Sequence, residues 1–166
     1  SAGLQLGSMQ SAHTAYLKAL EDYRYFLRTD YHRKKIRVIE KQRQTGQRIL
    51  KNMEKQNHSQ KQQLEIAHEI FAMDSPLYRQ GLISKLEYET ERNKYLQQQQ
   101  SCDAAASAID NQQLSLLQLE QNIFDLEQTR LEQENSLRIA LQGARKLLLS
   151  ESDGWEQNSL FRAPCS

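Results

Sequence analysis

Apolar residues recur at three- and four-residue steps along most of the chain, which is the spacing of one face of an α-helix. The first helical run is expected to begin at Ser8, which follows Gly7 and is a suitable N-cap. Its apolar positions are Ala12, Ala15, Tyr16, Ala19, Leu20, Tyr23 and Phe26 or Leu27. The pattern stutters at 27–31, where Thr29 or Asp30 can cap a new helix, so we expect a break or kink there.

The second run reaches about Ala72 and follows a heptad pattern, which is typical of a coiled coil. The positions on its seam are Ile36, Ile39, Arg43, Gly46, Leu50, Met53, Asn57, Gln60, Leu64, Ala67 and Phe71. The middle of this seam is polar. Glycine costs about 1 kcal/mol relative to alanine within a helix, so Gly46 indicates either close approach of another helix or simple tolerance.

The third run extends from about Ser84 to about Leu149 without a proline. Residues at seven-residue steps on its seam are Tyr88, Tyr95, Cys102, Ile109, Leu116, Ile123, Arg130, Leu137 and Ala144. The companion positions three residues later are Glu91, Gln98, Ala105, Gln112, Leu119, Leu126, Gln133, Ala140 and Leu147. The pattern predicts a single helix roughly 100 Å long at 1.5 Å per residue.

The segment 74–83 separates the second run from the third. Pro76 lacks an N–H and disfavours helix for Ser75 before it, so we expect the helical path to break in this segment. Gly81 can adopt a positive φ. Ser84 and Glu87 have the spacing of a capping box, which predicts the start of the third helix.

The two arms on either side of this segment are nearly equal in length. Folding the chain at 75–83 would place Leu20 level with Leu137, and Leu50 level with Ser107. We therefore expect an all-α fold: one long antiparallel α-helical hairpin, with the first arm broken near 27–31 and short extended ends. A compact three-helix bundle is the alternative, although it requires broader apolar faces because each helix would contact two partners.

Composition and charge narrow the function. The 166 residues carry a net charge of +1, and only 38% are hydrophobic, which suits thin helices with a narrow seam. The balanced charge argues against a nucleic-acid partner, and the basic run at 33–37 is typical of a solvated helix face. No run approaches the ~20 apolar residues that cross a bilayer. The chain begins and ends without clear boundaries, so we expect it to be part of a longer protein.

Residues for catalysis or metal binding do not cluster in the sequence. The four histidines have no partner at metal-ligand spacing, and the phosphate-loop and nucleophile-elbow motifs are absent. We therefore expect no enzyme activity, no metal and no cofactor. Cys102 falls on the seam and is expected to be a small buried apolar residue, too far along the hairpin from Cys165 for a disulfide.

The turn is more apolar than a surface loop usually is. It carries Leu77, Tyr78, Leu82 and Ile83, and those that do not cover the ends of the helices would form an exposed apolar contact surface.

Several stretches resemble the HlyD-like membrane fusion proteins, which are periplasmic adaptors. The stretch 82–89, Leu-Ile-Ser-Lys-Leu-Glu-Tyr-Glu, is similar to the start of the second hairpin arm, which often reads G-x-I-S-x-x-E. Trp155 followed by 160–164, Leu-Phe-Arg-Ala-Pro, resembles the entry into the second half of a lipoyl-like domain, and 6–10 resembles the exit from the first half. This resemblance implies three parts: an N-terminal remnant (1–7), the helical hairpin with its tip at 74–83 (8–150), and a C-terminal remnant (151–166).

The resemblance also implies a function. Such adaptors link an inner-membrane exporter, here of the ABC type and suited to type I secretion or efflux, to a TolC-like outer-membrane channel that meets the hairpin tip. They self-associate into rings that are commonly six-membered, and they lie in the periplasm with an inner-membrane anchor, which lies outside this stretch. The alternative is a generic coiled-coil scaffold that binds its partners along its flank.

Many members of this family carry a tip pattern of Arg, Leu and Ser. Ser84 and Leu77 match the Ser and the Leu, whereas Met73 stands where the pattern has Arg, and Arg79 is out of register. The residues expected to bind the partner at the tip are Met73, Leu77, Tyr78, Arg79, Gly81, Leu82 and Ser84.

Overall fold

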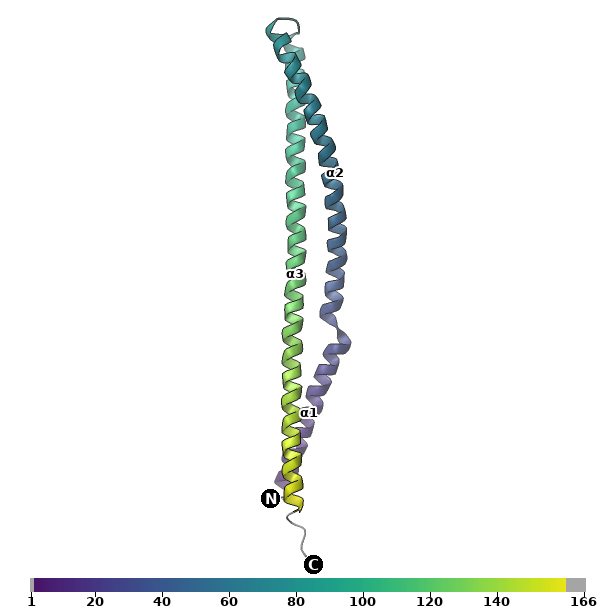
Figure 1. Cartoon of the computed structure of the whole chain (residues 1–166), viewed down its shortest axis with the longest axis vertical. Coiled ribbons are helices and arrows are strands. Elements are labelled where there is room, and N and C mark those ends of the chain that lie inside the picture. Colours follow the sequence, from purple (N-terminus) through teal and green to yellow (C-terminus); the bar gives the residue numbers. More distant parts are fainter. Residues whose placement is uncertain (1, 161–166) are drawn as a thin grey trace, which may run out of the picture. The chain divides into compact units, whose positions relative to one another are not determined.

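The computed structural model describes the backbone of residues 2–160, and the side chains of residue 7 and of residues 9–157. Three helices make up this part of the chain: α1 (Ala2–Thr29), α2 (Tyr31–Arg79) and α3 (Lys85–Leu160) (Figure 1). The described residues contain no strand, so the prediction of an all-α protein is confirmed.

The chain divides into two compact units. Unit 1 comprises Ser1–Arg37 and Ile123–Ser166, so it holds α1, the beginning of α2 and the second half of α3. Unit 2 is the continuous segment Val38–Asn122, which holds the rest of α2, the turn and the first half of α3.

In unit 1, a single residue separates α1 from α2. Asp30 has a φ of 44°, in the left-handed region, which α-helices do not use. Hydrogen bonding nevertheless continues through the break, because Asp30 N–H donates to the Phe26 carbonyl (3.2 Å) and the Asp30 carbonyl accepts from Lys34 N–H (3.1 Å). The predicted break at 27–31 is therefore confirmed, and it involves a single residue.

The helices of unit 1 extend beyond the predicted limits. α1 begins at Ala2 rather than at Ser8, and α3 continues to Leu160 rather than ending near Leu149. The prediction of extended ends is therefore wrong for 2–7 and 151–160. Neither stretch contains a proline, and a single glycine such as Gly7 or Gly154 costs a helix only about 1 kcal/mol. Cys165 and the other residues of 161–166 lie outside the described part.

The seam of α3 changes its phase within unit 1. The predicted companion positions Gln133, Ala140 and Leu147 are exposed. The residues that follow each of them are covered instead: Glu134, Leu141 and Leu148. A straight α-helix drifts by about 20° per heptad relative to a strict seven-residue repeat, and an extra four-residue step corrects this drift. That step appears here as 126–130–134, where two four-residue steps follow one another.

In unit 2, α2 and the first half of α3 lie side by side (Figure 1). Every predicted seam position of α2 from Ile39 to Phe71 is buried or partly buried. Contacts between the two helices join Gly46 to Gln112, Gln60 to Gln98, and Phe71 to Tyr88. Partner numbers in α3 therefore fall as residue numbers in α2 rise.

Gly46 lies where α2 and α3 approach closely. A Cβ atom at this position would be 2.8 Å from Leu116 Cδ2, so that the leucine side chain would have to shift, and 3.1 Å from Gln112 Nε2, which is a tight contact. Gln112 Nε2 also donates a hydrogen bond to the Gly46 carbonyl (3.2 Å). Close helix approach, rather than simple tolerance, is therefore the reason that glycine fits here.

The middle of the unit 2 seam is polar, as predicted. Asn57 is buried there, and Cys102 is also buried and carries a free thiol. Gln60 Nε2 donates to Ser101 Oγ (3.4 Å), while Gln98 Nε2 donates to the Gln60 carbonyl (3.4 Å). The amide side chains thus link the two helices where apolar side chains are few.

Candidate docking tip

The tip of unit 2 begins with the C-terminus of α2, which lies later than predicted. Pro76 lies inside α2, which continues to Arg79, so the prediction that the second run reaches only about Ala72 is wrong. Proline removes one N–H donor from the helix. Beside it, Ser75 Oγ donates to the Phe71 carbonyl at 2.9 Å. The chain keeps its helical path past the proline, and the turn is confined to 80–84.

The end of α2 is a Schellman motif. Leu82 N–H donates to the Leu77 carbonyl (2.9 Å), and Gly81 N–H donates to the Tyr78 carbonyl (3.0 Å). Gly81 has a φ of 73°, which a residue with a Cβ adopts only under strain. The prediction that Gly81 adopts a positive φ is confirmed, and this residue reverses the chain direction at the tip.

The start of α3 is the predicted capping box. Ser84 N–H donates to Glu87 Oε2 (2.7 Å), and Glu87 N–H donates to Ser84 Oγ (3.2 Å). The hydrogen bond from the Ser84 backbone, followed by that from its side chain, lowers the pKa of Glu87 below its ordinary value of 4.5. The box satisfies two donors at the helix start and keeps the Glu87 carboxylate charged.

Five rings form a ladder between α2 and α3 directly behind the turn. The order of contacts is His68, Tyr95, Phe71, Tyr88 and Tyr78. Two of the four contacts are parallel stacks: Phe71 on Tyr95, with centroids 5.6 Å apart, and Tyr78 on Tyr88, with centroids 4.6 Å apart. Stacked aromatic pairs stabilise beyond their buried area, so this aromatic ladder holds together the two helix ends that carry the turn.

Three of the predicted contact residues expose large apolar side chains. The exposed fraction is 62% for Met73, 37% for Leu77 and 66% for Leu82. Leu82 lies in the turn itself, immediately after Gly81. These side chains therefore remain available to a partner, which is the condition that docking at the tip requires.

The other predicted contact residues also have structural roles within the chain. Tyr78 is only partly exposed, because its ring stacks on Tyr88. Arg79 is exposed, and its Nε donates to the Ser75 carbonyl at 3.4 Å. Gly81 shapes the turn, and the exposed Ser84 caps α3 with its hydroxyl.

Sequence reasoning missed Leu86, which has an exposed fraction of 78%. Together with Ile83 and with Ile70 of α2, it lines a shallow groove beside the tip. Acidic and basic side chains border this groove, among them Asp74, Glu91 and Lys94. Leu86 falls off the predicted seam of α3, two residues before Tyr88, and this position was the signal in the sequence that could have revealed its exposure.

The tip carries exposed aliphatic side chains beside polar ones. Within the described part of the chain, no group of three or more His, Cys, Asp or Glu residues is arranged to hold a metal ion. None of the described helices is long and apolar enough to cross a bilayer. The tip exposes four aliphatic side chains, Met73, Leu77, Leu82 and Leu86, and further exposed aliphatic residues such as Ile66 and Leu117 lie along the helices.

Comparison of the whole chain with protein-family models, with curated proteins and with solved structures finds no match.

Proposed function

We propose that this chain is the helical hairpin of a periplasmic adaptor, and that its tip docks to a TolC-like outer-membrane channel. In this proposal α2 and α3 form an antiparallel hairpin, and the turn at 80–84 is its free end. The contacts of unit 2 support this arrangement, because Gly46 bonds to Gln112 and Gln60 bonds to Gln98. Partners that run in opposite directions along two neighbouring helices are what a hairpin requires.

The observation that carries the proposal is the exposure of Leu77 and Leu82 at the turn. Leu77 and Leu82 occupy the C3 and C″ positions of the Schellman motif, where an apolar pair is common, yet 37% and 66% of these side chains remain exposed. A channel tip with an apolar groove would remove them from water, at roughly 25 cal/mol for each Å² buried. Met73 occupies the place of the family's arginine, so the channel partner would meet a thioether there instead of a cation.

The remaining parts of the proposal follow from the family resemblance. The adaptor would work with an inner-membrane ABC exporter, would self-associate into a ring, and would be located in the periplasm. Its contribution to export is mechanical, because it bridges two membrane components and seals the path between them.

The test is an export assay with the Leu77→Asp, Ser84→Asp double variant. Aspartate is as good an N-cap as serine, so α3 keeps its cap while the tip acquires two charges. We expect export and channel binding to be lost while the far-UV circular dichroism stays unchanged. Export at the normal level from this folded variant would refute docking at the tip.

Ile66→Asp is the matched control. Ile66 is an exposed aliphatic residue of α2 outside the tip, so the control places one charge at a similarly exposed site. We expect it to export normally. Loss of export in both variants would point to a general effect of added charge.

A generic scaffold that binds partners along its flank is the second candidate. The exposed apolar side chains Val38 and Ile49 favour it, because they line a groove between α2 and α3 far from the turn. In that case Val38→Asp would abolish partner binding, and the tip variant would retain it.

A further inference from the structure

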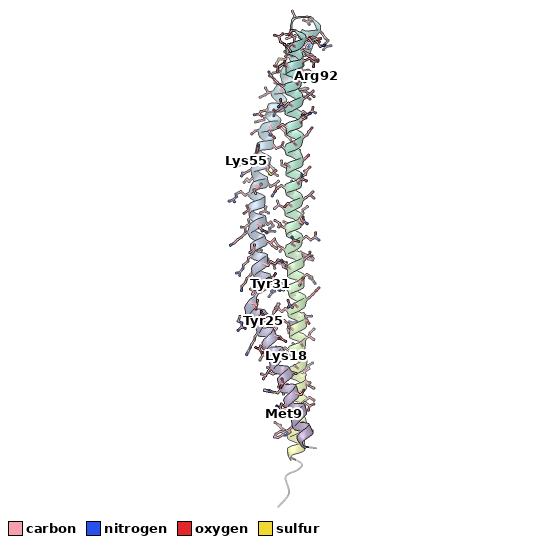
Figure 2. The ribbon with its side chains drawn as sticks, turned by 180° about the vertical axis from the view of Figure 1, so that it is seen from behind. Met9, Lys18, Tyr25, Tyr31, Lys55 and Arg92 are labelled. Atoms are coloured by element: carbon pink, nitrogen blue, oxygen red, sulfur yellow. The ribbon has the colours of Figure 1, made fainter. Side chains whose placement is uncertain are left out.

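Three cations follow one another at seven-residue steps along α2: Lys41, Arg48 and Lys55. Seven residues are close to two helical turns, so these side chains share one face, and this face is opposite the seam. All three are exposed, and Figure 2 shows Lys55 on the side of α2 that faces away from α3. Their charged groups pair with none of the described acidic side chains.

The outer face of α3 carries the opposite charge. Asp103 and Asp110 are also seven residues apart, both are exposed, and the next residue in the series is the exposed Leu117. Neither carboxylate has a cationic partner among the described residues. Unit 2 thus has an unpaired basic outer face on α2 and an unpaired acidic outer face on α3.

The two charged faces lie at the same level along unit 2. Gln112 donates a hydrogen bond to the Gly46 carbonyl. Arg48 lies two residues after Gly46 in α2, and Asp110 lies two residues before Gln112 in α3. Gln98 donates a hydrogen bond to the Gln60 carbonyl. Lys55 lies five residues before Gln60 in α2, and Asp103 lies five residues after Gln98 in α3. Both hydrogen bonds therefore give the same register, in which Arg48 is level with Asp110, Lys55 with Asp103, and Lys41 with Leu117.

We propose that the α2 outer face of one copy of this chain binds the α3 outer face of a second copy, side by side and pointing in the same direction. Arg48 of one copy would then meet Asp110 of the other, and Lys55 would meet Asp103, without any shift along the helices. The aliphatic stem of Lys41 would cover Leu117, which is otherwise exposed.

This contact joins two different faces, so each copy keeps one free basic face and one free acidic face. Such head-to-tail contacts close into a ring or continue as a filament. The absence of an axial shift favours closure, because a ring returns to its starting level. The inference rests on the self-association included in the proposed function, but it is independent of docking at the tip.

The test measures association of the 166-residue chain by sedimentation equilibrium at low and high salt. Exposed ion pairs are individually weak and are screened by salt, so we expect weak association that declines as salt rises. The variant Arg48→Glu, Lys55→Glu should raise the dissociation constant by at least about tenfold, because it places like charges opposite one another. Asp103→Lys, Asp110→Lys should do the same.

Mixing these two variants provides the decisive measurement. One has two acidic faces and the other has two basic faces, so each repels itself, but together they restore every ion pair. We expect the mixture to associate about as tightly as the unchanged chain. Failure of the mixture to associate, or a wild-type chain that stays monomeric at low salt, would overturn the proposed interface.

The matched control is Lys61→Glu, Lys85→Glu, which reverses two exposed cations away from the outer face of α2 and gives the same net charge. It should leave the dissociation constant unchanged. If it weakened association as much as Arg48→Glu, Lys55→Glu does, net charge alone would explain both results, and the proposed interface would be overturned. The tip variant Leu77→Asp, Ser84→Asp should also associate normally. The export defect of the tip variant therefore reports on docking, and the loss of association in the charge-reversal variants reports on self-association.

Discussion

Tyr78 and Tyr88 stack almost face to face, with ring centroids 4.6 Å apart and planes inclined by only 8°. Tyr78 lies in the last turn of α2 and Tyr88 in the first turn of α3. The stack therefore joins the two helix ends directly behind the turn. It stabilises the part of the chain that carries the exposed leucines of the tip.

The strength of this stack can be measured with a double-mutant cycle of Tyr78→Leu and Tyr88→Leu. Aromatic pairs contribute about 0.5–1.5 kcal/mol beyond their buried area. We expect a coupling of this size in the free energy of unfolding, measured by urea denaturation.

The control cycle uses Tyr78→Leu with Tyr95→Leu, because the ring of Tyr95 stacks on Phe71. These two changes should add to within about 0.5 kcal/mol. A coupling as large in the control as in the main cycle would show that the rings act as one unit rather than as separate pairs.

Gly46→Ala tests the close approach of α2 and α3. The new Cβ would lie 2.8 Å from Leu116 Cδ2, and overpacking of this kind typically costs about 1–3 kcal/mol. That cost offsets the roughly 1 kcal/mol that alanine gains over glycine in a helix, so Gly46→Ala should not stabilise the unchanged protein. In a Leu116→Ala background the clashing atom is gone, so the same change at Gly46 should stabilise the protein. Equal effects in the two backgrounds, measured by thermal unfolding, would contradict the close contact.

Ser84→Ala should destabilise the start of α3 by about 1 kcal/mol, the usual cost of removing an N-cap hydroxyl. Ser107→Ala is the control, because the Ser107 hydroxyl only donates to the Asp103 carbonyl within an exposed part of the same helix. Removing that local bond should change the free energy of unfolding little. Comparable losses from both changes would argue against a capping role.

The Glu87 carboxyl provides a pH-dependent readout of the capping box. Its pKa is lowered in the folded protein by the hydrogen bonds from Ser84, so the folded protein binds a proton less readily than the unfolded chain. The associated stability is present above the unfolded value of about 4.5 and is lost as the pH falls through the lower folded pKa.

NMR titration of the Glu87 side chain should therefore give a midpoint below 4.5. The Ser84→Ala variant should raise this midpoint, because it removes the side-chain hydrogen bond. A midpoint that does not move would show that the Ser84 side chain does not contribute to the lowered pKa of Glu87.

The heptad pattern predicted much of what lies inside the protein. Ile39, Asn57 and Cys102 were assigned to the seam from spacing alone, and all three are buried. The capping box at Ser84 was also recognisable, because both of its partners belong to one short stretch of sequence. Local spacing suffices where the determining contacts are local or strictly periodic.

The sequence did not predict features that depend on how the surrounding structure fits one particular residue. Pro76 disfavours helix on local grounds, yet α2 continues through it to Arg79. Whether Gly46 reflected close packing or mere tolerance depended on the size of its partners, Leu116 and Gln112.

The hydrogen bonds of the turn have a calorimetric consequence. The amides of Gln80, Gly81, Leu82 and Ser84 all donate within the chain, so they are already satisfied before any partner arrives. What the tip offers to a partner is then mainly aliphatic surface. Binding at the tip should accordingly show a negative heat-capacity change, with an enthalpy that becomes steadily more favourable as the temperature rises.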